Sequence, residues 1–266
     1  MRALWIYIFF LFSFIETMAQ PGVANRLQGA EGLYAKIPVV WGMEAYPAAL
    51  ASQRSPQAGI YAERRFMRGP DFFQLAFSGE IFKEHFLFSA SREGTNAFSY
   101  DRIGLAAGKR ISPVFQIAVC ISYTGFSARG YAGRGSLGAG LGAVLQLSEQ
   151  VRFGVQADQL NALVSENPDF PFRLHAGLGY RLSPVFAFTI EITKESGHEL
   201  ILDVGLRYVF YGNAYARMGY SPGLSLFSVS AGFEKNALRM EAGPAYHLSL
   251  GASWGLSLIY QFNRSE

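Results

Sequence analysis

The chain has 266 residues, of which 50% are hydrophobic, 15% aromatic and 16% charged, with a net charge of +3. Soluble domains usually carry about 25% charged residues, so this sequence is poor in charge and rich in aromatic rings. The nearest approach to a basic patch is Arg64, Arg65 and Arg68. We therefore expect no nucleic-acid partner.

The N-terminus has the pattern of an export signal. A basic start at Met1-Arg2 is followed by an apolar run over residues 3–15 and by Thr17-Met18-Ala19, a site of small residues. This order predicts a secretory signal peptide over residues 1–19. The alternative, a membrane-anchoring helix, would need roughly 20 apolar residues, more than this run provides. The single cysteine, Cys120, excludes an internal disulfide.

From residue 57 onward, apolar residues alternate with small or polar ones, most clearly in 171–182, 184–194, 200–210 and 251–262. In the last of these, one face carries Trp254, Leu256, Leu258, Tyr260 and Phe262. Successive strand residues point to opposite faces, so each segment has one apolar face. A soluble β-sandwich also alternates. However, its strands average about 5–6 residues, whereas these segments approach the 9–11 residues that cross a membrane.

Turn signals divide residues 57–262 into about fourteen strands, an even number as bacterial outer-membrane barrels have. The expected strands are 57–67, 72–82, 85–92, 98–109, 114–126, 135–147, 151–161, 171–182, 185–194, 199–210, 213–220, 224–234, 238–246 and 251–262. Every second connection is short, which is typical of periplasmic turns. The fold class is therefore all-β: an antiparallel transmembrane β-barrel in the outer membrane of a Gram-negative bacterium. We expect it to be monomeric, in contact with outer-membrane lipid, with both termini periplasmic.

Residues 20–56 precede the first strand and contain Pro21, Pro38, Pro47 and Pro56, which break long elements. They are longer than a tether requires, so we expect an N-terminal hatch that fills the lumen. Residues 263–266 form a short C-terminal tail.

Two stretches resemble a known family. Residues 39–51 (Val-Val-Trp-Gly-Met-Glu-Ala-Tyr-Pro-Ala-Ala-Leu-Ala) resemble the Asn-Pro-Ala-x-Leu-Ala segment before the first strand of FadL-like barrels. Tyr61-Ala62-Glu63-Arg64-Arg65-Phe66 resembles the first strand of the PorV/PorQ-like branch of that superfamily, which is common in Bacteroidetes. The hatch motif would comprise Trp41, Gly42, Pro47, Ala48 and Leu50. Tyr46 stands where the family usually has Asn.

The resemblance implies two functions. PorV/PorQ-like barrels are accessories of type IX secretion or surface attachment and act through secretion-system proteins, which is the main hypothesis. FadL-like barrels pass small hydrophobic solutes passively, so a channel for a small apolar ligand is the alternative.

The alternation places a set of charged side chains in the lumen: Glu63, Arg65, Glu80, Arg102, Arg152, Asp158, Arg173, His175, Arg181, Glu191, Asp203 and Arg207. An interior ion-pair network is one interpretation. A selectivity lining for an anionic solute is the other, because arginine outnumbers the acids.

We expect no enzyme and assign no catalytic residue. The remote alternative is an outer-membrane lipid hydrolase, since His247-Leu248-Ser249 is reminiscent of a His-x-Ser pairing, although no acid lies close in sequence. The four histidines lack metal-ligand spacing, so we also expect no metal and no cofactor.

Overall fold

The computed structural model describes residues 28–35, 38–66, 69–82, 84–165 and 170–262. The predicted signal peptide, residues 20–27 of the predicted hatch and the tail at 263–266 lie outside the described residues. Within the described part, no helix has both the length and the apolar character needed to span a bilayer.

Fourteen antiparallel strands form a closed barrel, as predicted, in which each strand pairs with its sequence neighbours and β1 closes the wall by pairing with β14. The strands are β1 (Gln57–Arg64), β2 (Asp71–Ile81), β3 (Glu84–Gly94), β4 (Phe98–Arg110), β5 (Phe115–Ala128), β6 (Arg134–Gln146), β7 (Val151–Asp158), β8 (Arg173–Arg181), β9 (Phe186–Glu195), β10 (Ile201–Tyr211), β11 (Ala214–Ser221), β12 (Leu226–Lys235), β13 (Leu238–His247) and β14 (Gly251–Gln261). The loops contain α5 (Ala162–Ser165) and the 3-10 turn η2 (Pro222–Leu224).

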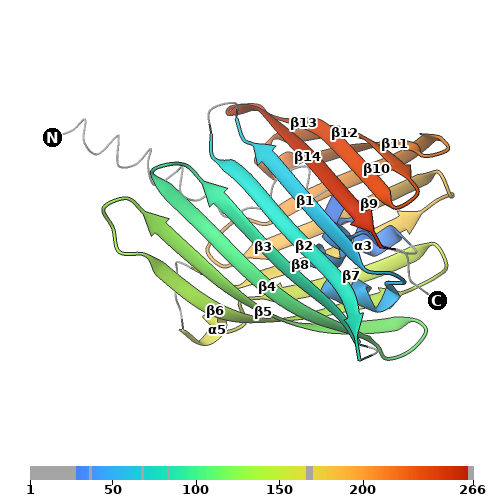
Figure 1. The fold of residues 1–266 in the computed structure, drawn as a ribbon, viewed down its shortest axis with the longest axis horizontal. Helices are drawn as coiled ribbons and strands as arrows, with labels where there is room; N and C mark the ends of the chain where they lie inside the picture. Colours follow the sequence, from blue (N-terminus) through green and yellow to red (C-terminus); the bar gives the residue numbers. More distant parts are fainter. Residues whose placement is uncertain (1–27, 36–37, 67–68, 83, 166–169, 263–266) are drawn as a thin grey trace.

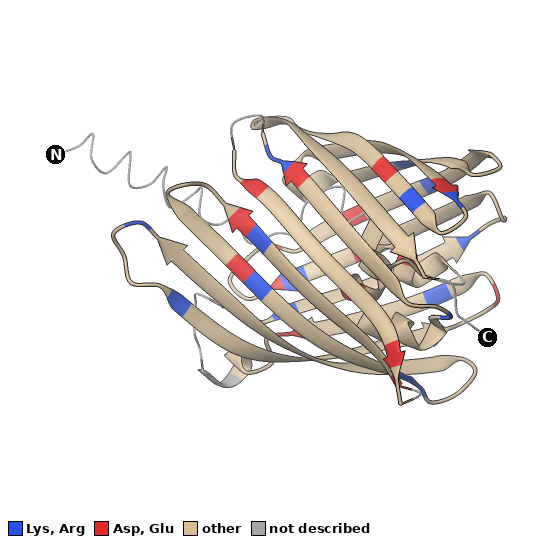
Figure 2. Ribbon diagram, viewed as in Figure 1, with Lys and Arg blue, Asp and Glu red and all other residues tan. Residues whose placement is uncertain are grey.

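The outer face of the wall is apolar. On β14 the side chains of the predicted apolar face are exposed, and the exposed fraction is 60% for Trp254 and 52% for Leu256. The partners that alternate with them, such as Ser257 at 1%, are buried in the interior. Figure 2 shows that Lys, Arg, Asp and Glu occupy only scattered positions along the strands. An apolar outer band around a polar interior is the arrangement of barrels that face lipid.

Two strands end three residues earlier than predicted: β1, expected to reach residue 67, ends at Arg64, and β7, expected to reach residue 161, ends at Asp158. Gln159 has a positive φ of 56°, a conformation that is uncommon for a residue with a side chain and that ends an extended strand. The N-terminal part of β6 therefore has no strand partner in β7 among the described residues.

The hatch, meaning the described residues 28–35 and 38–56, lies inside the barrel (Figure 1). It consists of α3 (Glu31–Tyr34), α4 (Val40–Ala45) and the 3-10 helix η1 (Pro47–Ser52). These pack against β7–β9, β1–β3 and β3–β6 respectively. We call the end where β1 begins and β14 ends the hatch end, and the opposite one the loop end.

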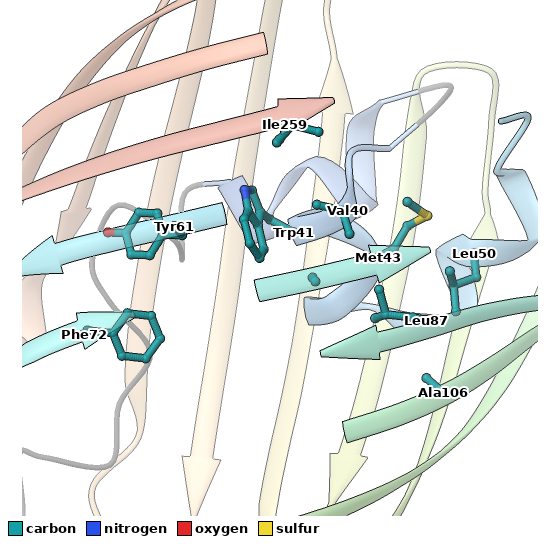
Figure 3. Close-up of a cluster of buried hydrophobic side chains, with 10 residues drawn as sticks. Val40, Trp41, Met43, Leu50, Tyr61, Phe72, Leu87, Ala106 and Ile259 are labelled. Carbon is teal, nitrogen blue, oxygen red and sulfur yellow. The ribbon is translucent and has the colours of Figure 1, made fainter. Parts of the chain in front are cut away.

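Apolar side chains fix α4 and η1 against one side of the wall (Figure 3). Val40, Met43 and Leu50 are fully buried. They join a buried hydrophobic cluster to which the wall contributes Tyr61, Phe72, Ala76, Leu87, Ala106 and Ile259. Burying a side chain of this size contributes about 1.5–3 kcal/mol, so the cluster alone is a strong reason for the hatch to stay in place.

Glycines on the inner face of the wall make room for the hatch. A Cβ added at Gly179 would lie 2.6 Å from the backbone of Leu33, which cannot move aside without shifting α3. At Gly125, by contrast, an added Cβ would meet only the Tyr123 ring, at 3.4 Å.

We predict that Gly179→Ala destabilises the barrel by about 1–3 kcal/mol, the usual cost of overpacking, while Gly125→Ala leaves stability nearly unchanged. The measurement is the temperature at which the compact band of the unboiled protein converts to the unfolded band in gel electrophoresis. Equal conversion temperatures for the two variants would contradict the contact between Leu33 and the wall.

Candidate functional site: the lumen and its hatch

The predicted lumen residues lie on the inner positions of their strands, in several separate groups. Near the loop end, Arg65 contacts both Glu63 and Glu93, and all three side chains are buried. Arg102 lies 3.8 Å from Asp158, and Arg173 lies 3.2 Å from Glu195.

The remaining predicted residues lie deeper. His175 Nε2 lies 3.2 Å from the Glu191 carboxylate, and Asp203 lies opposite Glu191 in the β9–β10 register. The residues toward the hatch end are Glu80, Arg152, Arg181 and Arg207. The structure therefore places these residues at inner positions of the wall, with Glu80 exposed at the hatch end, and does not bring them together as one site.

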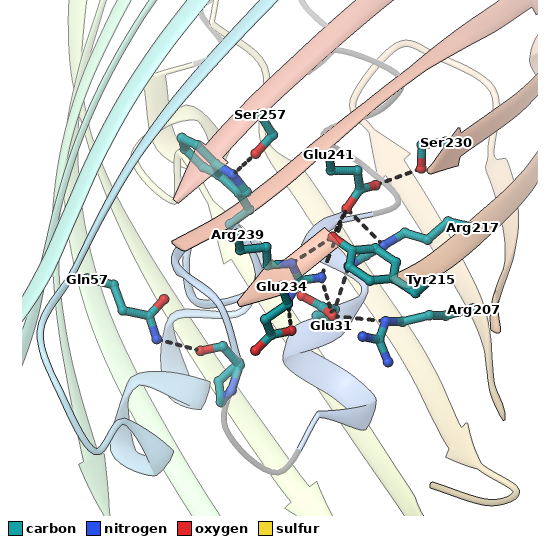
Figure 4. A network of polar contacts seen from close by, with 12 residues as sticks. Glu31, Gln57, Arg207, Tyr215, Arg217, Ser230, Glu234, Arg239, Glu241 and Ser257 are labelled. Carbon is teal, nitrogen blue, oxygen red and sulfur yellow. Dashed lines mark hydrogen bonds and ion pairs between the residues drawn. The ribbon is translucent and has the colours of Figure 1, made fainter. Parts of the chain in front are cut away.

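The hatch is joined to the other side of the wall through Glu31, the first residue of α3 (Figure 4). Its Oε1 lies 2.8 Å from Arg217, 2.8 Å from Arg239 and 3.6 Å from Arg207. Glu31 is 2% exposed. One buried hatch carboxylate is therefore the shared partner of guanidinium groups from β10, β11 and β13, and we call this group the Glu31 latch.

A second layer supports the latch. Glu241 accepts hydrogen bonds from the Tyr215 hydroxyl and the Ser230 hydroxyl, each 2.7 Å long, and its carboxylate lies 3.2 Å from Arg217. The Tyr215 hydroxyl in turn accepts a 2.8 Å hydrogen bond from Arg239. The guanidinium carbons of Arg207, Arg217 and Arg239 lie 4.5–5.3 Å from the Tyr215 ring centre. These contacts hold the three guanidinium groups around the Glu31 carboxylate.

Of the Glu31 latch, the sequence-based set of lumen residues includes only Arg207. The set lacks the latch residues Glu31, Arg217 and Arg239 and the supporting residues Tyr215 and Glu241, which come from the hatch, β11 and β13. The signal was nevertheless present, since Tyr215 and Arg217 alternate in β11 as Arg239 and Glu241 do in β13. No sequence pattern, however, places Glu31 opposite them.

The hatch-motif residues hold the hatch in the barrel. Trp41 is 1% exposed and its Nε1 donates a 2.8 Å hydrogen bond to Ser257 of β14. A Cβ at Gly42 would lie 2.6 Å from the backbone nitrogen of Gly32, so this glycine allows α3 and α4 to cross closely. Pro47 begins η1, and Ala48 and Leu50 are buried.

Tyr46, the residue that departs from the family pattern, contacts the wall. Its hydroxyl lies 3.3 Å from His175 Nε2, and its ring stacks on the His175 ring at 4.9 Å between centroids. Two arginines hold hatch carbonyls: Arg152 donates to Ala35 O (2.7 Å) and Arg110 donates to Ala51 O (3.0 Å). The hatch is thus bonded to the wall on several sides.

The hydrogen-bonded ladder of the wall is interrupted between β6 and β7. Pairing runs only over residues 141–146 of β6, and one further bond joins Leu160 N to Ala139 O. Among the described residues, 134–138 have no ladder partner on the β7 side. Leu137, 66% exposed, carries the apolar outer face along this stretch, and Leu141, 54% exposed, lies at its edge as the first residue paired with β7. We call it the ladder break.

Gln159 covers the inner side of the ladder break. Its Nε2 donates a 3.3 Å hydrogen bond to Thr124 of β5. An added Cβ at Gly138 would lie 2.1 Å from Gln159 Oε1, so the side chain lies against the bare glycine face of β6. A single amide side chain thus occupies the place of the missing strand pairs.

The His-x-Ser pair has a local structural role. His247 Nδ1 accepts hydrogen bonds from the backbone N–H groups of Ser249 (3.1 Å) and Leu250 (3.2 Å). This ring nitrogen therefore stabilises the β13–β14 turn. Among the described residues, no three His, Cys, Asp or Glu side chains are grouped so as to hold a metal ion.

We predict that Glu31→Gln weakens the hatch by about 3–5 kcal/mol, the usual loss when one partner of a buried ion pair is removed. The reason is that buried guanidinium groups lose their shared charge. The measurement is the rate at which protease cleaves the hatch in the folded barrel. Glu84→Gln is the matched control, because its pair with Lys109 is on the outer surface and exposed pairs contribute about 0–1 kcal/mol. Equal cleavage rates would show that the latch does not retain the hatch.

No protein-family model and no curated protein sequence matches the chain. Solved structures do match. A Pseudomonas aeruginosa FadL homologue superposes with a TM-score of 0.63 at 11% identity, over 89% of this chain and 98% of that one. The Pseudomonas putida toluene transporter TodX gives 0.65 at 9%, over 88% and 97%. The CymD monoaromatic hydrocarbon channel gives 0.65 at 13%, over 94% and 100%. At these identities the similarity establishes the fold alone, a closed antiparallel β-barrel with the architecture of the three matched structures.

Proposed function

We propose that the chain is a passive channel that passes small apolar solutes across the outer membrane of a Gram-negative bacterium, with the hatch end in the periplasm. The fold is shared with barrels described as hydrocarbon channels. The observation that carries the proposal is the ladder break, because a channel needs a path through or along the wall.

Because of the hatch, a lateral path would break fewer contacts inside the barrel than an axial path. An axial route at the hatch end would have to separate the hatch from the cluster around Val40 and Trp41 and from the Glu31 latch. Among the described residues, a lateral route at the ladder break would have to move the Gln159 side chain from the face of Gly138 and separate Leu160 N from Ala139 O. Since Leu137 and Leu141 line the outer edge, an apolar solute leaving there would enter the hydrocarbon region directly.

We predict that a disulfide across the ladder break, made by Gly138→Cys with Gln159→Cys in a Cys120→Ser background, slows apolar uptake at least several-fold. The readout is the fluorescence rise of 1-N-phenylnaphthylamine in porin-deficient cells before and after reduction. Leu105→Cys with Ile121→Cys is the matched control, because these residues are paired in the intact β4–β5 ladder. Slow uptake restored by reduction only in the first pair supports the proposal. Equal uptake in both oxidised pairs contradicts it.

A secretion-accessory role of the PorV/PorQ kind is the second proposal, and its support is the resemblance at residues 39–51 and 61–66. It differs in needing a stable protein partner at the loop end, where the connections are short apart from residues 159–172. Native mass spectrometry of the barrel in mild detergent separates the two. A stoichiometric protein partner favours the accessory role, whereas a barrel without a partner counts against it.

A further inference from the structure

A cavity of about 280 Å³ lies at the hatch end, between the hatch and the wall. One side is formed by residues 53–56, the segment that joins η1 to β1. The other side is formed by Glu80 and Phe82 at the end of β2 and by His85 in β3. This volume is close to the lower end of the roughly 300–1,000 Å³ that small-molecule pockets enclose. The cavity therefore has room for a small organic molecule.

Contacts beside the cavity fix its two sides. Gln53 is 7% exposed, and its Nε2 donates 2.9 Å hydrogen bonds to Ser55 O and to Ser78 Oγ of β2. Ser78 and Glu80 are successive inner positions of β2, and Glu80 is paired with His85 in the β2–β3 register. These bonds hold the segment 53–56 beside the two strands, with the cavity between them.

Two side chains of the lining have no partner of their own. Among the described residues, neither the Arg54 guanidinium nor the His85 imidazole makes a hydrogen bond or an ion pair. Arg54 is exposed, so its donors are accessible. Because no hydrogen bond orients the His85 ring, either of its nitrogens can turn toward the cavity. Both side chains are therefore available to a ligand.

The lining also carries one acid. Glu80 lies on the strand side, opposite the segment that carries Arg54, and is engaged in another interaction. A carboxylate has about four acceptor positions, so this interaction leaves acceptors for a ligand. The other charges nearby are occupied, since Arg110 donates to a hatch carbonyl and Lys109 pairs with Glu84 on the outer surface. The cavity thus has a positive charge on one side and a negative charge on the other.

The rest of the lining is polar on the hatch side and apolar at its edge. Ser55 Oγ accepts a hydrogen bond from Gln261, which leaves its hydroxyl proton free to donate. Arg54 and Ser55 together therefore form a donor side that suits a carboxylate. Pro56 and Phe82 supply apolar surface, and the Phe82 ring is 95% exposed.

We infer that this cavity binds a small zwitterion with an apolar side chain, namely a free α-amino acid. Arg54 and Ser55 hold its carboxylate. Glu80 and the His85 ring accept hydrogen bonds from its ammonium group, which has three donors and no acceptor. A molecule with only one of these charges leaves one charged side of the cavity without a counter-charge. The site is separate from the ladder break, so it does not depend on the channel proposal.

The test is equilibrium dialysis of the full chain in uncharged detergent against three radiolabelled probes that share one ring: phenylalanine, 3-phenylpropionate and 2-phenylethylamine. At neutral pH the first carries both charges, the second only the negative charge and the third only the positive charge. Retention by detergent micelles alone is subtracted. We expect phenylalanine to be retained about fivefold more strongly than either of the others, because each of these lacks one exposed charge pair.

Arg54→Gln should lower the retention of phenylalanine about fivefold. Arg64→Gln is the matched control and should leave retention unchanged, because Arg64 is an exposed arginine that pairs with Asp71 at the loop end. Equal retention of the three probes, or stronger retention of a singly charged probe, overturns the inference, and this comparison uses the unaltered protein. An Arg54→Gln variant that retains phenylalanine as well as the unaltered protein overturns it too.

Discussion

The constraint on which the structure depends is that backbone polar groups facing lipid must be hydrogen-bonded within the protein. A closed ladder from β1 to β14 satisfies this requirement. Closure of the barrel also determines the direction in which each side chain points. Alternate side chains must face lipid or the lumen, so apolar and polar residues alternate. A barrel of this size encloses a wide lumen, and the hatch fills its hatch-end part. Against this background, the ladder break leaves the described residues 134–138 of β6 without a β7 partner, a longer stretch than the three unpaired residues at the ends of β2, β10 and β14.

The hatch is held by two different kinds of interaction on two sides. Apolar burial fixes α4 and η1 against β1–β4, while the Glu31 latch joins α3 to β10, β11 and β13. Removing one partner of a buried ion pair is strongly destabilising, because the other charge is left buried without compensation. Together they make the hatch a structural part of the barrel, and the path for a solute has to be sought in the wall.

Much of the fold was predictable because the period of two is strong in long strands. The alternation of Leu256, Leu258 and Tyr260 with Ser257 is sufficient to place β14, and the short turns give the strand number. The end of β7 was not predictable, because a positive φ at a glutamine leaves no mark in composition. Apart from Arg207, the latch was missed for a different reason: Glu31 precedes its partners by more than 170 residues, and only the closed fold brings them together. Likewise, Tyr46 was noted as a departure, but its contact with His175 required the structure.

The central claim is that apolar solutes pass through the wall while the hatch stays in place. It is tested most directly by fixing the hatch. A Cβ added at Gly108 of β4 would lie 2.8 Å from Leu50 Cβ, so Leu50→Cys with Gly108→Cys in a Cys120→Ser background would tie η1 to β4 by a disulfide. The measurement is the uptake of 1-N-phenylnaphthylamine with this disulfide formed and then reduced. The account predicts the same rate in both states. Uptake that stops when the disulfide forms and returns on reduction would show that the hatch itself is the gate.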